Sequence, residues 1–181
     1  PGLAATYQLD ATPARHTQGG ELLAPGSGLD LPKFERTVYT GRAEFHKTLV
    51  NLMHVVNSAG LCMFGYLSMD ANSIPAFMSA VTGWEFTMDT CQEAGERIAT
   101  IRHAFNLREG RNPLDLKVPG RIIGRPPLQR GPLKDISVDM ETMVKEYLEL
   151  MDWDPVTTVP SQKRLLELGL DEVAADLKKR V

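Results

Sequence analysis

The sequence is poor in cysteine, has no long hydrophobic run and carries no strong excess of charge of either sign. Two cysteines among 181 residues are too few for a disulfide framework, which favours a reduced, cytoplasmic setting. The longest nearly unbroken apolar stretch, residues 59–67, is far too short for a transmembrane helix, which needs about 20 residues. Twenty basic against 23 acidic residues give a net charge of −3, so we expect neither nucleic acid nor a membrane as a partner.

Familiar catalytic motifs are also missing from the sequence. It contains no HExxH, no P-loop, no GxSxG, no GxGxxG and no CxxC pair. Candidate chemistry therefore depends on four histidines, two cysteines and a few carboxylates. The chain begins at Pro1 rather than at a methionine, and we expect it to be a fragment or a processed part of a longer protein.

Hydrophobic periodicity predicts helices and no strands. Apolar residues recur at helical spacing in several segments, and Gly or Ser, Thr and Asp residues stand where helix ends are expected. We expect helices at about 2–9, 42–57, 73–82, 88–107, 139–152, 161–168 and 171–180. The segment 60–65 is apolar but too brief for a helix of its own. The predicted fold class is all-α and multihelical.

The same periodicity predicts which side chains face the core. For the helix at 42–57 these are Phe45, Leu49, Leu52, Met53 and Val56, and Val55 on the polar side hints at a second buried face. For the helix at 88–107 they are Cys91, Ala94, Ile98, Ile101 and Phe105. For the helix at 139–152 they are Met140, Met143, Val144, Tyr147, Leu150 and Met151.

Residues 108–134 form the one long stretch with no helical pattern. They include five prolines and four glycines, and seven basic residues against two acidic ones give a local charge of +5. An irregular stretch of this length is unusual inside a compact domain. It either wraps over the helices or packs against something absent from this chain. Its lack of interleaved aromatic residues argues against a nucleic-acid surface.

The two cysteines differ in their surroundings. Cys91 lies on the apolar stripe of a predicted helix, where a cysteine behaves as a small core residue. Cys62 follows Gly60 and Leu61 just beyond a helix end, where backbone can approach a ligand closely. A thiolate there is suited to a soft metal or an iron–sulfur cluster, although local context alone favours a buried structural cysteine.

Local context gives none of the histidines a clear catalytic role. His16 lies in a polar loop and is expected to be solvated; beside a reacting centre, its ordinary pKa of about 6.5 would suit an acid or base. His46 and His54 are two helical turns apart, too far for an i, i+4 metal pair, so we expect structural or surface roles. His103, next to Arg102 on a polar helix face, is expected to be solvated.

Several short motifs, in order, resemble the tungsten-containing aldehyde ferredoxin oxidoreductase family. The segment 57–62 (NSAGLC) is similar to the family's D-x-x-G-L-C motif. The others are Gly-Trp at 83–84, AGERI at 94–98, FNLREG at 105–110, Pro-Gly-Arg at 119–121, Tyr-Leu at 147–148, Trp-Asp at 153–154 and LLELGL at 165–170. The resemblance covers nearly the whole chain.

This resemblance implies that residues 1–181 are the C-terminal helical region of a larger oxidoreductase, with a sub-boundary in 110–134. The N-terminal domain that cradles the metallopterin would be absent. Family members hold tungsten, or sometimes molybdenum, between two pterins, and a [4Fe–4S] cluster passes electrons to ferredoxin. The intact enzyme would oxidise an aldehyde to a carboxylic acid. The isolated chain would be inactive and without bound cofactor.

The resemblance also assigns site residues. Cys62 would be the fourth ligand of the [4Fe–4S] cluster, whose other three come from a C-x-x-C-x-x-x-C motif absent here. Asn57 stands where the family has an Asp that hydrogen-bonds the pterin, and Gly60 and Leu61 complete this cofactor-binding segment. His16 precedes Cys62 by 46 residues (62 − 16), about where the family carries its active-site histidine.

A second hypothesis is a stand-alone helical interaction module without metal chemistry. The partners implied by the first hypothesis are the missing N-terminal part, ferredoxin and an aldehyde. Exposed apolar helix surface would favour self-association into a homo-oligomer. An upstream C-x-x-C-x-x-x-C segment in the same reading frame would decide between the two.

Overall fold

The fold is a set of helices arranged around one central helix, in a computed structural model that describes residues 2–17, 19–20 and 24–180. The helices are α1 (Gly2–Leu9), α2 (Ala43–Ser58), α3 (Met63–Leu67), α4 (Ser73–Thr82), α5 (Met88–Arg108), α6 (Met140–Leu150), α7 (Gln162–Glu167) and α8 (Asp171–Arg180), with a 3-10 turn, η2, at Pro113–Asp115. Within the described residues, extended pairing is limited to isolated bridges, such as Trp153 with Pro160. The all-α prediction is confirmed.

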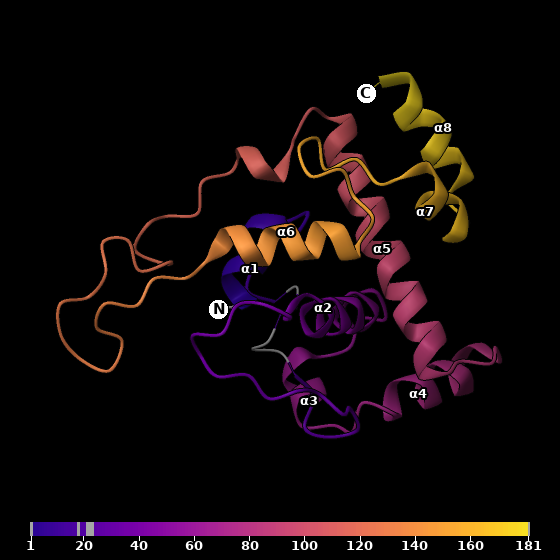
Figure 1. Ribbon diagram of the computed structural model, residues 1–181. Helices are drawn as coiled ribbons and strands as arrows, with labels where there is room; N and C mark the ends of the chain where they lie inside the picture. Colours follow the sequence, from indigo (N-terminus) through magenta and orange to yellow (C-terminus); the bar gives the residue numbers. More distant parts are fainter. Residues whose placement is uncertain (1, 18, 21–23, 181) are drawn as a thin grey trace.

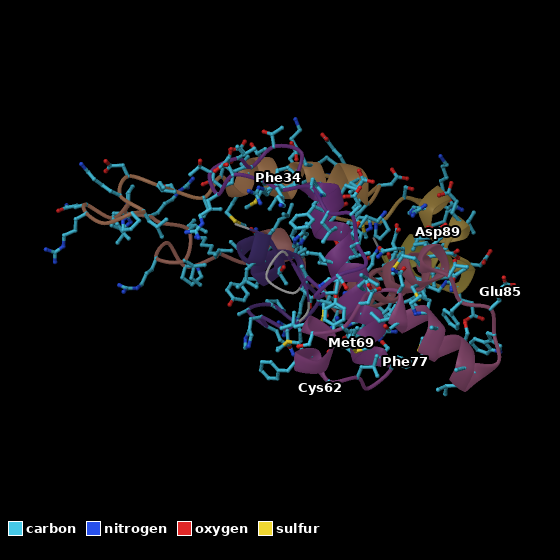
Figure 2. The ribbon with its side chains drawn as sticks, turned by 90° about the horizontal axis from the view of Figure 1, so that it is seen from below. Phe34, Cys62, Met69, Phe77, Glu85 and Asp89 are labelled. Carbon is cyan, nitrogen blue, oxygen red and sulfur yellow. The ribbon has the colours of Figure 1, made fainter. Side chains whose placement is uncertain are left out.

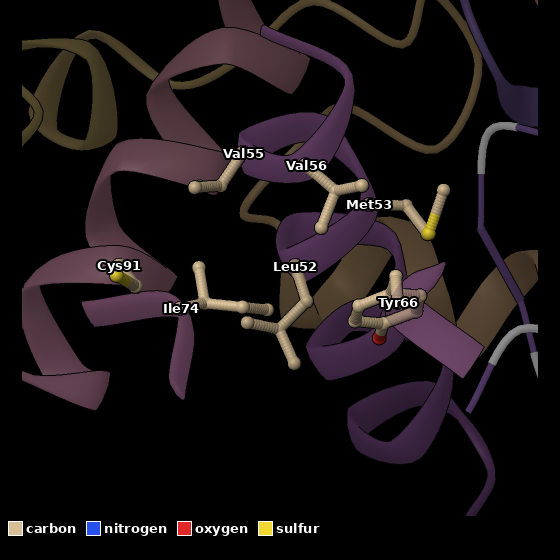
Figure 3. Close-up of a cluster of buried hydrophobic side chains, with 7 residues drawn as sticks. All are labelled: Leu52, Met53, Val55, Val56, Tyr66, Ile74 and Cys91. Atoms are coloured by element: carbon tan, nitrogen blue, oxygen red, sulfur yellow. The ribbon is translucent and has the colours of Figure 1, made fainter. Parts of the chain in front are cut away.

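Helix α2 occupies the centre, with α5 crossing it, α6 packed beside it and α1 packed against α6 (Figure 1). Every residue from 49 to 56 is buried, so this helix has no solvent face over two turns. The periodicity predicts a single apolar face for this helix, yet the polar residue Asn51, which is not part of that face, is only 1% exposed. Val55 is buried as its position hinted, and it belongs to the same cluster as Cys91 of this chain's own α5 (Figure 3).

A glycine sets how closely α5 crosses α2. A Cβ added at Gly95 would lie 2.2 Å from the backbone oxygen of Asn51, so no side chain fits between the two helices. The next residue, Glu96, is 4% exposed and ion-paired. Its carboxylate meets Lys47 Nζ at 2.8 Å and Arg164 Nη2 at 2.6 Å. One buried carboxylate thus joins α5 to α2 and α7.

The predicted stripe of α5 holds at Cys91 and at Ala94, which packs against the buried cluster that contains Cys91, but it is wrong at Ile101 and Phe105. Ile101 and Phe105 are 43% and 53% exposed. The buried positions are instead the small and polar ones: Gly95, Glu96, Ala99, Thr100, His103 and Ala104. Because α5 packs so closely on α2, its inward face favours small side chains, which a search for large apolar residues overlooks. On α6 the same search chose Leu150, which is exposed, and passed over Leu148, which is buried.

Three clusters of buried apolar residues make up the core. The largest joins α2 to α3, α4 and α5 (Figure 3), and its members are Leu52, Met53, Val55, Val56, Tyr66, Ile74 and Cys91. The second joins α1 to α6 and the following turn through Ala5, Leu9, Tyr147, Leu148, Met151 and Trp153. The third joins α5 to α7 and α8 through Ala104, Leu165, Leu168, Leu170 and Leu177.

The segment between η2 and α6 leaves the helices and projects to one side (Figure 1). It contains no α-helix, as its prolines and glycines predict. The apolar segment at 60–65 departs from expectation, because residues 63–67 form the short helix α3. No helix among the described residues has the length and apolar character that a bilayer span requires.

Candidate functional site

The candidate site lies where α2 ends and the chain turns into α3. Gly60 adopts a φ of 70°, a left-handed conformation that glycine reaches without strain. The backbone N–H of Leu61 then donates to the Val56 carbonyl at 3.0 Å, which closes the end of α2. A Cβ at Gly60 would meet nothing within 4 Å, so this glycine is needed for the turn and not for internal packing.

Cys62 is placed by this turn as the N-cap residue of α3, and its side chain is exposed. Figure 2 shows it at the lower rim of the molecule, on the same side as Phe77. The backbone N–H groups of Gly65 and Phe64, in the first turn of α3, lower the pKa of the Cys62 thiol. Local context had favoured a buried structural cysteine here, and that interpretation is wrong.

Cys91 shows the opposite environment. It is fully buried in the core cluster of α2, as predicted, and burial raises the pKa of its thiol. Metal ligation requires the thiolate, so Cys62 is the chemically suited sulfur of the two. In the described part of the chain, no three His, Cys, Asp or Glu side chains gather into a metal-binding group. Cys62 would therefore bring a single ligand to any cluster held here.

The loop carrying His16 is joined to this turn by Asn57. The Asn57 side-chain N–H donates to the backbone carbonyl of Thr17 at 3.1 Å. His16, the neighbour of Thr17, is exposed. The Arg15 guanidinium donates to the Thr17 hydroxyl at 3.0 Å. Three residues singled out from sequence, His16, Asn57 and Cys62, thus belong to two segments that one hydrogen bond links.

A buried polar network lies at the start of the same loop. Asp10 accepts the backbone N–H of Thr12 at 2.7 Å and lies 3.7 Å from Arg102 of α5. Arg102 also approaches His54 Nδ1 at 3.1 Å. Because a guanidinium only donates, Nδ1 must accept, and the proton of His54 resides on Nε2, 3.5 Å from Asp10.

Burial governs the protonation of this network. It lowers the pKa of His54 to about 3, with the positive charge of Arg102 adding to the effect, so His54 is neutral despite facing a carboxylate. It raises the pKa of Asp10 although Thr12 and Arg102 oppose that rise. The sequence analysis missed this network. The Asp-x-Thr spacing signals a local turn, but nothing in the sequence pairs Asp10 with Arg102.

The remaining histidines are interior residues. The prediction that His103 is solvated is wrong: it is 2% exposed, stacks on Trp153 with ring centroids 3.9 Å apart, and contacts the Thr158 carbonyl through Nε2 at 2.8 Å. His46 is buried against the edge of the Tyr147 ring. The buried positions of His46 and His54 agree with the structural roles expected for them.

Helices α3 and α4 expose apolar side chains beside the candidate site. Phe64, Phe77, Val81 and Trp84 are between 52% and 85% exposed. Phe64 lies in α3, two residues after Cys62, whereas Phe77 and Val81 lie in α4 and Trp84 lies just beyond its end. Exposed apolar side chains of this size are typical of a surface that contacts another protein or domain.

The described part of the chain is helical, and the turn after α2 presents an exposed thiol next to a segment that one hydrogen bond links to the His16 loop. The family model for aldehyde ferredoxin oxidoreductase, domains 2 & 3, matches residues 1–170. The chain belongs to the aldehyde ferredoxin oxidoreductase family, as its motifs indicated.

Individual relatives agree with this membership. The chain is 34% identical over 123 residues to a tungsten-containing aldehyde ferredoxin oxidoreductase from Pyrococcus horikoshii. It is 33% identical to the protein of that name from Pyrococcus furiosus and 31% identical to the one from Thermococcus kodakarensis, each over 123 residues. These matches cover 67% of this chain and 20% of each relative, so the chain spans only a small part of their length.

Proposed function

We propose that this chain is the C-terminal helical part of a cytoplasmic enzyme that oxidises aldehydes to carboxylic acids. Electrons would leave through a [4Fe–4S] cluster to ferredoxin, and the metal would be tungsten or molybdenum between two pterins. The observation that carries the proposal is Cys62: within a family-matched chain, its exposed thiol, with pKa lowered by two backbone N–H groups, fits a cluster ligand.

The residues of this chain fit defined roles in that reaction. Oxidising an aldehyde with water releases two protons and two electrons. When bound, the metallopterin and the cluster would accept and transmit the electrons. Cys62 would hold one iron, and the turn at Gly60 and Leu61 would let the backbone approach the pterin. His16, exposed on its loop, would accept a proton released from the reacting centre.

The apolar surface of α3 and α4 supports the proposal that other parts of the same protein complete the site. The relatives are about five times as long as the matched region, and we propose that their counterpart here, upstream of residue 1, covers Phe64, Phe77 and Trp84. The isolated chain would then be inactive. Sequencing the coding region upstream of residue 1 tests this directly. A continuous frame with C-x-x-C-x-x-x-C is expected; a start codon at residue 1 would favour the interaction module instead.

The cluster assignment is tested with a matched pair of cysteine variants in the full-length enzyme. Cys62→Ser should lose the iron content and the electron paramagnetic resonance signal of the reduced cluster, together with aldehyde-dependent reduction of a viologen dye. Cys91→Ser should keep all three, because its sulfur is enclosed in the core. Retention of a full cluster in Cys62→Ser would refute the ligand role.

A further inference from the structure

We propose that Asn57 is a positioning residue that fixes the His16 loop to the segment carrying Cys62. This inference rests on the proposed function for its catalytic consequence but not for the contact itself. The contact is the hydrogen bond from the Asn57 amide N–H to the Thr17 carbonyl at 3.1 Å. It joins residues 40 apart in the sequence, one beside His16 and the other five positions before Cys62.

The chemistry of the contact selects the residue at position 57. A backbone carbonyl only accepts hydrogen bonds, so the side chain facing Thr17 must donate. An amide donates, whereas an ionised Asp, the residue of the family motif at this position, does not. The departure from D-x-x-G-L-C therefore has a local cause: Asn57 uses its N–H for the loop and keeps Oδ1 as an acceptor, the function that the carboxylate would serve toward the pterin.

Two other contacts hold the loop, one on each side of His16. On one side, the Ala14 N–H donates to the Tyr7 carbonyl of α1 at 3.0 Å. On the other, Gly19 lies so close to α2 that a Cβ there would be 2.6 Å from the Val50 Cα. His16 lies exposed between these two contacts. Within this stretch, the Thr17 carbonyl accepts the hydrogen bond from Asn57 of α2.

Hydrogen exchange tests the contact in the 181-residue chain, without any cofactor. Asn57→Ala removes the donor, and Asn57→Asp replaces it with an acceptor of the same size. Both should accelerate exchange of the hydrogen-bonded amides of Thr12 and Ala14, about fivefold for the loss of one hydrogen bond. Ser58→Asp is the matched control, because it places the same charge on the next, exposed residue, and it should leave these amides unchanged. Unchanged exchange in both Asn57 variants, or equal acceleration in Ser58→Asp, would overturn the proposal.

Steady-state kinetics of the full-length enzyme test the consequence for His16. Asn57→Ala should lower kcat with little change in KM, and Asn57→Asp should also shift the pH profile to higher pH, since a nearby carboxylate favours protonated histidine. Faster exchange with unchanged kcat and pH profile would support the contact while refuting the catalytic role proposed for His16. Failure of the Asn57 contact and failure of the catalytic role of His16 therefore give different results.

Discussion

Gly95 and Gly60 belong to two motifs through which this chain resembles its family, and their surroundings differ sharply. At Gly95 an added Cβ would strike the α2 backbone at 2.2 Å, and the adjoining Glu96 is buried in ion pairs. At Gly60 an added Cβ would meet nothing within 4 Å, and the adjoining segment ends in an exposed cysteine. The first motif is explained by helix packing within the chain. The second has open space at its glycine and an exposed thiol at its end, although its Leu61 packs against the core cluster of α2.

This difference separates residues that the fold requires from residues whose side chains the fold leaves exposed. The interior motif AGERI is accounted for by close crossing, by the Glu96 ion pairs, and by Arg97, whose Nε donates to the Leu168 carbonyl at 2.6 Å. The edge motif NSAGLC gives the fold the end of α2, the packing of Leu61 and the Asn57 hydrogen bond to Thr17, and it leaves the Cys62 thiol exposed. Side chains that folding does not use are the better candidates for function.

The largest expected effect that sharpens this comparison is acid unfolding driven by the interior. Burial lowers the pKa of His46 and His103 to about 4 and that of His54 to about 3, against about 6.5 in the unfolded chain. Between pH 6.5 and 4 the unfolded state binds more protons, so the free energy of unfolding falls as the pH falls. Above pH 6.5 these groups have no effect. We expect a loss of several kcal/mol across this window, at about 1.4 kcal/mol per pKa unit, measured by urea denaturation at successive pH values.

Histidine variants distinguish interior from edge in the same measurement. His103→Gln should flatten the pH dependence by about a third, since one of three buried imidazoles is removed. His16→Gln, at the exposed edge, should leave the slope as it is. Asp10, whose pKa is raised by burial, acts in the opposite sense near pH 4 and offsets part of the loss. If His103→Gln did not alter the pH dependence of the free energy of unfolding, His103 would not be one of the buried histidines that cause it.

A smaller effect is expected from the buried carboxylate of α5. Glu96→Ala removes the carboxylate that pairs with Lys47 and leaves Arg164 only its pair with Glu167, and it should lower the free energy of unfolding by about 3 kcal/mol. Glu93→Ala is the control one turn earlier: its ion pair with Arg97 is exposed, and it should cost less than about 1 kcal/mol. Equal losses in the two variants, measured by urea denaturation, would remove the distinction between an interior motif and a solvated one.

The smallest effect on stability is expected at the edge. Cys62→Ser should leave the urea midpoint of this chain unchanged, because the exposed sulfur packs against nothing that the fold needs. Cys91→Ser buries a hydroxyl in an apolar cluster and should destabilise by about 1–2 kcal/mol. In the iron and spectroscopic assay of the full-length enzyme we expect the reverse: Cys62→Ser has the large effect and Cys91→Ser has none. Loss of stability in Cys62→Ser would show that the edge motif also serves folding.

Much of the fold follows from patterns within single segments. The helix that ends just before Gly60, the helix capped by Thr87 and the helix capped by Ser161 are each explained by residues a few positions apart. The candidate site was predictable only in part, since His16, Asn57 and Cys62 came from a family resemblance. Their joining through the Thr17 carbonyl had no signal in the sequence, and their roles at a cofactor stay predictions.

The sequence by itself determined the all-α class, the positions of every helix except the short α3, and the irregular course of 108–134, because local hydrogen bonding, capping and backbone freedom depend on near neighbours. Tertiary structure alone decided which faces are buried. It enclosed His103, Asn51 and Glu96, exposed Ile101 and Phe105, and set Cys62 at the surface. Burial depends on which helices meet and how closely, and a single contact, such as Gly95 against the backbone of α2, can turn a helix face toward the core without any large apolar side chain.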